Sequence, residues 1–153
     1  FTHRATITLV GDDRTAPSHG MGAKVLGVHG SGRLDLHGAP RVAWTKLAET
    51  AEPGATRLVL ARGVDWQPGD RIVVTATGWD ARESEEVTVA AVSGTQVTLA
   101  GGVRVRHFGR LQTIGGVPVD ERAEVGLLTH TIHVTSRFGR DSLLGGHVMF
   151  TGD

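Results

Sequence analysis

Three charged residues, Asp120, Arg122 and Glu124, occupy alternate positions just before an apolar, strand-like run. Side chains two residues apart point the same way in an extended chain, so we expect these three to meet and bond to one another. Two carboxylates can hold a hard divalent cation such as calcium, and an arginine can grip a sugar carboxylate through two hydrogen bonds. The cluster is therefore a candidate catalytic or metal site. An ion-pair network with a structural role explains it as well, and we predict that this role comes first.

A second, weaker candidate is the short basic stripe formed by Arg104, Arg106 and His107, which lies next to Phe108. Such a stripe could line a groove that binds an anionic glycan, although a solvated sheet edge is the plainer interpretation. His130 shares its parity with Leu128, Ile132 and Val134, so we expect it to be a core histidine. The sequence requires no cofactor and defines no complete set of metal ligands.

Composition limits the classes of function. The chain has 153 residues, with 16 basic and 16 acidic side chains and no cysteine. The balanced charge argues against a nucleic-acid or membrane-surface partner, because both usually select a basic excess. Membrane contact by this segment is not expected, since no run approaches the ~18 apolar residues of a membrane-spanning helix. Without cysteine, disulfides and thiol chemistry are excluded.

The elements that must position these residues are mostly strands. The 22 glycines are spread between short runs of valine, isoleucine, leucine and threonine, which is typical of strands joined by tight turns. Residues 64–99 predict an antiparallel meander with a turn at Pro68-Gly69 and with Trp66 in its core. One short helix is expected at residues 45–51. Further strands are predicted over residues 5–10, 24–28, 33–37, 57–60, 111–114, 127–134 and 147–151.

Five segments in order resemble a known family: GAKVLGVH (22–29), LDLHGAP (34–40), WTKLAETA (44–51), VDWQPGDRIVV (64–74) and RAEVGLLT (122–129). Together they are similar to the G8 domain and the start of the parallel β-helix that follows it. That architecture occurs in fibrocystin-L-like surface proteins and in cell-migration-inducing-type hyaluronidases. After the last segment the family usually has Arg-Asn-Ile, where this chain has His130-Thr131-Ile132.

The resemblance implies a mostly β fold in which a G8-type antiparallel meander with one short helix joins the first rungs of a right-handed parallel β-helix. It implies a G8-like domain at residues 1–118 and the start of the β-helix at residues 119–153. Both ends of the chain fall in strand-like sequence, so a piece of a longer protein is expected, with the rest of its own β-helix as a partner.

Two functions follow from the resemblance. The first is a structural or recognition module of a large extracellular or cell-surface protein, which contacts neighbouring domains or an anionic polysaccharide. The alternative is the N-terminal part of a hyaluronan-type polysaccharide-cleaving enzyme. Such an enzyme would need residues beyond 153, and a later His-x-His segment would favour it. The sequence leaves catalysis open.

Overall fold

The computed structural model describes residues 4–11, 24–137 and 145–152. Its contacts divide the chain into two units, described separately below. The terminal unit combines Phe1–Ala39 with His130–Asp153, and the central unit is Pro40–Thr129. Both are built from strands, so the prediction of a mostly β fold is confirmed. In the described part of the chain, no helix has the length and apolar character needed to cross a membrane.

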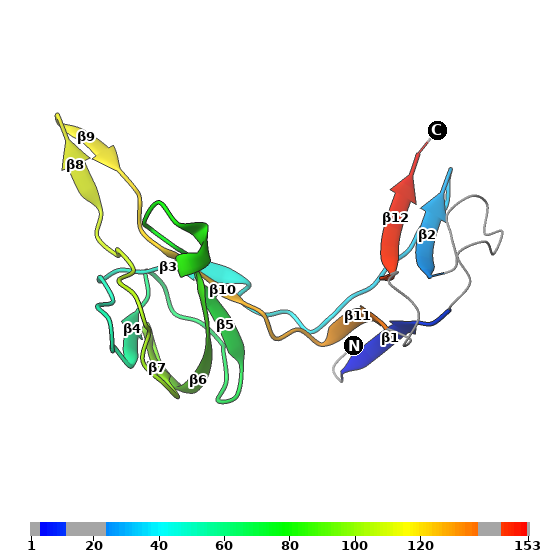
Figure 1. Ribbon diagram of the computed structural model, residues 1–153, viewed down its shortest axis with the longest axis horizontal. Helices are drawn as coiled ribbons and strands as arrows, with labels where there is room; N and C mark the ends of the chain where they lie inside the picture. Colours follow the sequence, from blue (N-terminus) through cyan, green and yellow to red (C-terminus); the bar gives the residue numbers. More distant parts are fainter. Residues whose placement is uncertain (1–3, 12–23, 138–144, 153) are drawn as a thin grey trace. The chain divides into compact units, whose positions relative to one another are not determined.

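The terminal unit consists of two parallel strand pairs, each joining segments far apart in the sequence. Strand β1 (Ala5–Leu9) pairs with β11 (Ile132–Ser136), and β2 (Val25–His29) pairs with β12 (His147–Thr151). Figure 1 shows each pair side by side, blue against orange and red. In both pairs the partners keep one register over all five residues. Residues before and after the central unit therefore build one structure together.

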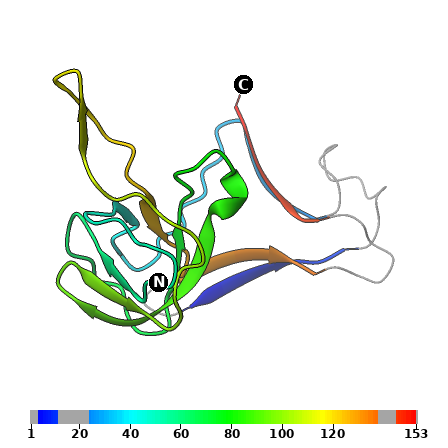
Figure 2. The same cartoon turned by 60° about the vertical axis from the view of Figure 1, so that its left-hand side comes forward.

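The central unit contains a six-stranded antiparallel sheet in the order β3-β10-β5-β6-β7-β4. A bridge between Leu47 and Leu60 joins the continuations of the two edge strands, so the sheet curls back on itself (Figure 2). A separate hairpin pairs β8 with β9. The strands are β3 (Trp44–Lys46), β4 (Arg57–Val59), β5 (Arg71–Val74), β6 (Glu85–Ser93), β7 (Gln96–Leu99), β8 (Gln112–Ile114), β9 (Val117–Val119) and β10 (Glu124–Leu127).

The core of the central unit follows from alternation along these strands. Ile72 and Val74 of β5 are fully buried, as are Val97 of β7 and Val125 of β10, while the residues between them face outward. A period of two places one face of each strand inside the curled sheet and leaves the other exposed. Burial of these apolar side chains is the main stabilising contribution.

The predicted meander is confirmed. Strands β5, β6 and β7 are consecutive antiparallel neighbours, and Gly69 adopts a φ of +91° in the turn before β5. The carboxylate of Asp70 accepts a hydrogen bond from the amide of Gln67 at 2.7 Å and one from Arg41 at 2.6 Å. Trp66 is 3% exposed and donates its indole N–H to the carbonyl of Val42 at 2.7 Å, so its core position is also confirmed.

The predicted helix at residues 45–51 is wrong. Its first part is strand β3, and Leu47 and Ala51 form isolated bridges with Leu60 and His107. Burial here alternates with a period of two, at Thr45 and Leu47, and Trp44 is exposed rather than on the buried face. Pairing with distant strands therefore overrides the local helical spacing. Within the described residues the structure has one helical turn, the 3₁₀ helix η1 (Ala81–Glu83), which Asp80 caps.

Two further expectations fail. No strand forms over residues 33–37. The strand predicted at 127–134 is interrupted: β10 ends at Leu127 and β11 begins at Ile132. The interruption breaks the expected parity, so His130 is exposed and Leu128 and Val134 are each 40% exposed.

Candidate functional site

A polar cavity of about 580 Å³ in the central unit is the main candidate site. Residues 75–79, which follow β5, line one side, and Asp120, Glu121, Arg122 and Glu124 line another. Lys46 of β3 completes the lining. The sequence-predicted cluster therefore lies on a cavity wall, where a ligand could reach it.

Asp120 and Arg122 form a bidentate ion pair. Nε and Nη2 of Arg122 donate to the two carboxylate oxygens of Asp120 at 2.8 and 3.0 Å, and Nη1 reaches the carbonyl of Leu47 at 3.3 Å. Lys46 Nζ lies 3.1 Å from the same carboxylate. Hydrogen bonds from Arg122, and then the contact with Lys46, lower the pKa of Asp120 well below its usual range, against the opposing effect of desolvation. Asp120 is therefore an ionised group shared by two cations.

Glu124 is not bonded to this pair, contrary to the expected mutual cluster. In the part of the chain that the structure describes, its carboxylate makes no hydrogen bond or ion pair, although its backbone N–H donates to Thr75 Oγ1 at 2.8 Å. Glu124 sits opposite Lys46 in the β10–β3 ladder and lines the same cavity. Lys46 is thus the partner of Asp120 that sequence parity did not identify.

Trp79 is the other prominent residue of the cavity. Its side chain is fully exposed, in a loop between Gly78 and the capping residue Asp80. A large aromatic surface left in water is unfavourable unless a ligand or partner covers it. The same cavity is lined by charged side chains, a combination that suits a ligand with both apolar faces and polar groups.

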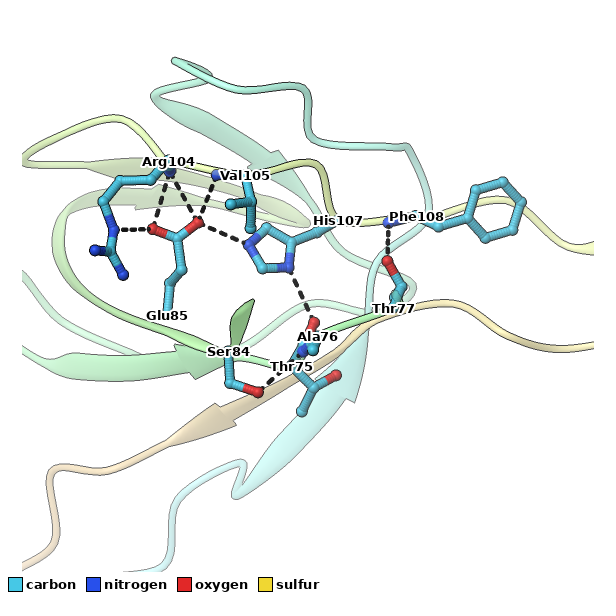
Figure 3. A network of polar contacts seen from close by, with 9 residues as sticks. All are labelled: Thr75, Ala76, Thr77, Ser84, Glu85, Arg104, Val105, His107 and Phe108. Atoms are coloured by element: carbon cyan, nitrogen blue, oxygen red, sulfur yellow. Dashed lines mark hydrogen bonds and ion pairs between the residues drawn. The ribbon is translucent and has the colours of Figure 1, made fainter. Parts of the chain in front are cut away.

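A buried polar network centred on Glu85 and His107 is bonded to the backbone of Thr75, which lines the cavity (Figure 3). Glu85 is 3% exposed and His107 is completely buried. The Glu85 carboxylate accepts hydrogen bonds from the backbone amides of Arg104 and Val105, from Nε of Arg104 at 2.9 Å, and lies 3.0 Å from Nε2 of His107. Each donor compensates part of the cost of burying this charge.

The pKa of Glu85 reflects these opposing effects. Burial is the largest single influence and raises the pKa. The hydrogen bonds from the Val105 amide, from the Arg104 side chain and amide, and from His107 together outweigh it, and the pKa falls to about 2. Glu85 is therefore ionised at neutral pH and acts as an acceptor for every neighbour.

The network fixes the loop that forms the cavity wall. Nδ1 of His107 donates to the carbonyl oxygen of Thr75 at 2.9 Å, and the amide of Phe108 donates to Thr77 Oγ1 at 3.0 Å. The amide of Ala76 donates to Ser84 Oγ at 3.0 Å. Figure 3 shows these three contacts at successive residues of the segment that follows β5. Residues 75–77 thus present Trp79 from a well-supported backbone.

The three residues of the basic stripe lie in different environments: Arg104 and Arg106 are exposed, and His107 is buried. The side chain of Arg104 is 78% exposed although it pairs with Glu85, and that of Arg106 is 54% exposed and pairs with Glu52. His107 is inside the protein. Glycan contact by this stripe stays a prediction. In this structure the contact would depend on the exposed side chains of Arg104 and Arg106, because His107 is buried and does not reach the surface.

Sequence reasoning missed Glu85 and Trp79. Glu85 begins a strand as one of two successive glutamates, and nothing local distinguishes it from the exposed Glu86. The sequence does hold a weak indication that Trp79 is exposed, because this tryptophan lies in a turn region between Gly78 and Asp80 and not in a strand. Among the described residues no group of three or more histidine, aspartate or glutamate side chains meets closely enough to hold a metal ion.

Comparison with known proteins shows which proteins this sequence resembles. Residues 1–48 match the G8 domain. The chain is 44% identical to human fibrocystin-L over 138 residues, which is 86% of this chain and 3% of that protein. It is 38% identical to mouse fibrocystin over 111 residues, or 71% of this chain and 3% of that protein. The tailspike gp61 of Pseudomonas phage phi297 aligns with a TM-score of 0.49 at 17% identity, over 99% of this chain and 22% of that one.

These matches confirm the resemblance to the G8 domain and to fibrocystin-L. The similarity to hyaluronidases stays a prediction. The tailspike similarity is too low to define the fold, which rests on the strand pairings described above. The chain is thus similar to the G8 domain over residues 1–48 and to a segment of the fibrocystins, and it spans 3% of the length of each of these two relatives.

Proposed function

We propose that the chain is a structural and recognition module of a large extracellular or cell-surface protein, and that it contacts glycan. The observation that carries the proposal is the polar cavity that fully exposed Trp79 and the Asp120–Arg122 ion pair both line. Sugar rings have apolar faces and hydroxyl edges, so they match an aromatic platform next to fixed donors and acceptors. The similarity to fibrocystin-L supports the setting in a large surface protein.

The two parallel ladders of the terminal unit support the structural part of the proposal. In each ladder, a strand that precedes the central unit pairs in parallel with one that follows it. This is the pairing expected of two successive rungs of a right-handed parallel β-helix, with the central unit following the first rung and preceding the second in the sequence. Further rungs of the same protein would then be its neighbours. The division of the chain at residues 118 and 119 stays a prediction.

Catalysis receives less support than binding. A general acid needs a pKa near the working pH, whereas Asp120 is held ionised by two cations. The assignment of Asp120, Arg122 and Glu124 as catalytic residues of a hyaluronan-type enzyme therefore stays a prediction. A role in positioning and hydrogen bonding a glycan fits the pair better.

The experiment is a binding titration of the 153-residue chain, followed by ¹H–¹⁵N NMR. Hyaluronan and heparin hexasaccharides serve as anionic probes, and maltohexaose, cellohexaose and chitohexaose as neutral ones. Saturable shifts of the amides of residues 75–79 and 120–124 with any probe support the proposal. A spectrum that no probe changes would contradict it.

A further inference from the structure

A second hollow of about 480 Å³ adjoins the cavity described above. It is lined by Trp44, Thr45, Lys46, Ala61, Arg62 and Arg122. Lys46 and Arg122 also line the first cavity, so these two side chains border both hollows. Trp44 is 51% exposed, which gives the second hollow an accessible tryptophan as Trp79 does the first.

The sheet itself leaves room in front of Trp44. Trp44 and Lys46 share the outer face of β3, because Thr45 between them is buried. The residue opposite Trp44 in the neighbouring strand is Gly126, and the residue opposite Lys46 is Glu124. Glycine has no side chain to cover the neighbouring ring across the strands. Because Gly126 lies opposite, no side chain of the neighbouring strand covers the Trp44 ring from that position.

The charges around the combined groove balance. Lys46, Arg62 and Arg122 supply three positive charges, and Asp120, Glu121 and Glu124 supply three negative ones. Each of the three cations also has a partner within the fold: Lys46 and Arg122 contact Asp120, and Arg62 donates to the carbonyl of Trp44 at 2.6 Å. A polyanion would meet carboxylates as well as cations, and it would have to compete for bonds already made.

We propose that this groove binds a neutral oligosaccharide, with one sugar ring on Trp79, another on Trp44, and hydroxyl groups hydrogen-bonded to the Lys46–Asp120–Arg122 cluster between them. The inference rests on the proposed function and narrows it, because the sequence pointed to an anionic polysaccharide. Charge balance and two accessible aromatic side chains on adjoining hollows are the features that favour neutral sugar.

The indole N–H signals of the three tryptophans provide the test, with maltohexaose, cellohexaose and chitohexaose as probes. Trp66 is an internal control, because its indole N–H is bonded to Val42 in the core. We expect at least one neutral probe to shift the Trp44 and Trp79 signals and to leave that of Trp66 in place. Since neutral sugars release no counterions, raising the salt concentration should leave the affinity unchanged.

Trp79→Ala and Trp44→Ala should each weaken that binding about tenfold or more, as truncated aromatic anchors commonly do. Ile114→Ala, which removes another exposed apolar side chain, from β8, is the control and should leave the affinity unchanged. Binding of hyaluronan or heparin hexasaccharide alone, or neutral binding that neither tryptophan variant affects, would overturn this inference while leaving glycan contact in place. The absence of any binding would overturn both.

Discussion

Nε2 of His107 lies 3.0 Å from Oε1 of Glu85, while Nδ1 of the same buried ring lies 2.9 Å from the carbonyl oxygen of Thr75. A carbonyl oxygen can only accept, so Nδ1 carries a proton. The contact between Nε2 and the Glu85 carboxylate is a second hydrogen bond of the same ring. The pair thus joins a buried carboxylate to the backbone that supports the cavity.

Glu85→Gln should lower the free energy of unfolding by about 2–4 kcal/mol, because the new amide NH₂ would face donors that now meet a carboxylate. Urea denaturation measures the change. Glu86→Gln is the control, since the neighbouring residue is exposed and makes a surface ion pair with Arg71, worth about 0–1 kcal/mol. Equal losses in the two variants would show that the buried network adds no stability.

Stability should also depend on pH through Glu85. Its pKa is lowered from 4.5 to about 2 on folding, so its contribution is complete above pH 4.5 and is lost as the pH falls through about 2. This corresponds to about 3 kcal/mol at most. Urea midpoints of the wild type should fall over this range more steeply than those of Glu85→Gln. Parallel pH profiles would contradict the assignment.

Arg122→Ala should cost about 1–2 kcal/mol of unfolding free energy, less than a fully buried pair would. The reason is that the Arg122 side chain is 21% exposed and Lys46 stays with Asp120. Arg82→Ala is a matched control, because Arg82 makes the same two-residue pairing with Asp80 but is 90% exposed. Chemical denaturation compares the two. If Arg82→Ala lowered the unfolding free energy as much as Arg122→Ala, the Asp120–Arg122 pair would contribute no more than an exposed surface pair.

Trp66 and Trp79 should differ in how much their substitution destabilises the chain. Trp66→Ala should destabilise the chain by about 3–5 kcal/mol, since it removes a buried ring. Trp79→Ala should change stability by about 0.5 kcal/mol or less, because its ring is fully exposed. Thermal unfolding followed by circular dichroism measures both. A large loss of stability for Trp79→Ala would mean that the ring packs on the protein and is not available to a ligand.

Two glycines of one connecting segment give a packing test. A Cβ at Gly109 would overlap the backbone carbonyl of Glu49, whereas one at Gly101 would meet nothing within 4 Å. Gly109→Ala should therefore cost about 1–3 kcal/mol or more as the backbone shifts. Gly101→Ala should be close to neutral in the same urea titration. Similar midpoints for the two variants would show that the close approach at Gly109 is easily relieved.

The sequence by itself determined the features that depend on neighbours along the chain. Alternation at Ile72–Val74 and Val97–Leu99, with turns at Gly69 and Gly94, defines the β5–β6–β7 meander. The two-residue spacing of Asp120 and Arg122 likewise predicted their contact. Such features are readable because strand parity and turn conformation depend on a few consecutive residues.

Tertiary structure decided the rest. Residues 45–51 have helical spacing, yet Trp44–Lys46 pairs with β10 as a strand and no helix forms there. The contacts of Lys46 with Asp120, of His107 with Glu85, and of β1 with β11 join segments far apart in the sequence. No local pattern encodes which distant partner a polar side chain will meet. Burial then decides which charges become part of the core and which remain available to a ligand.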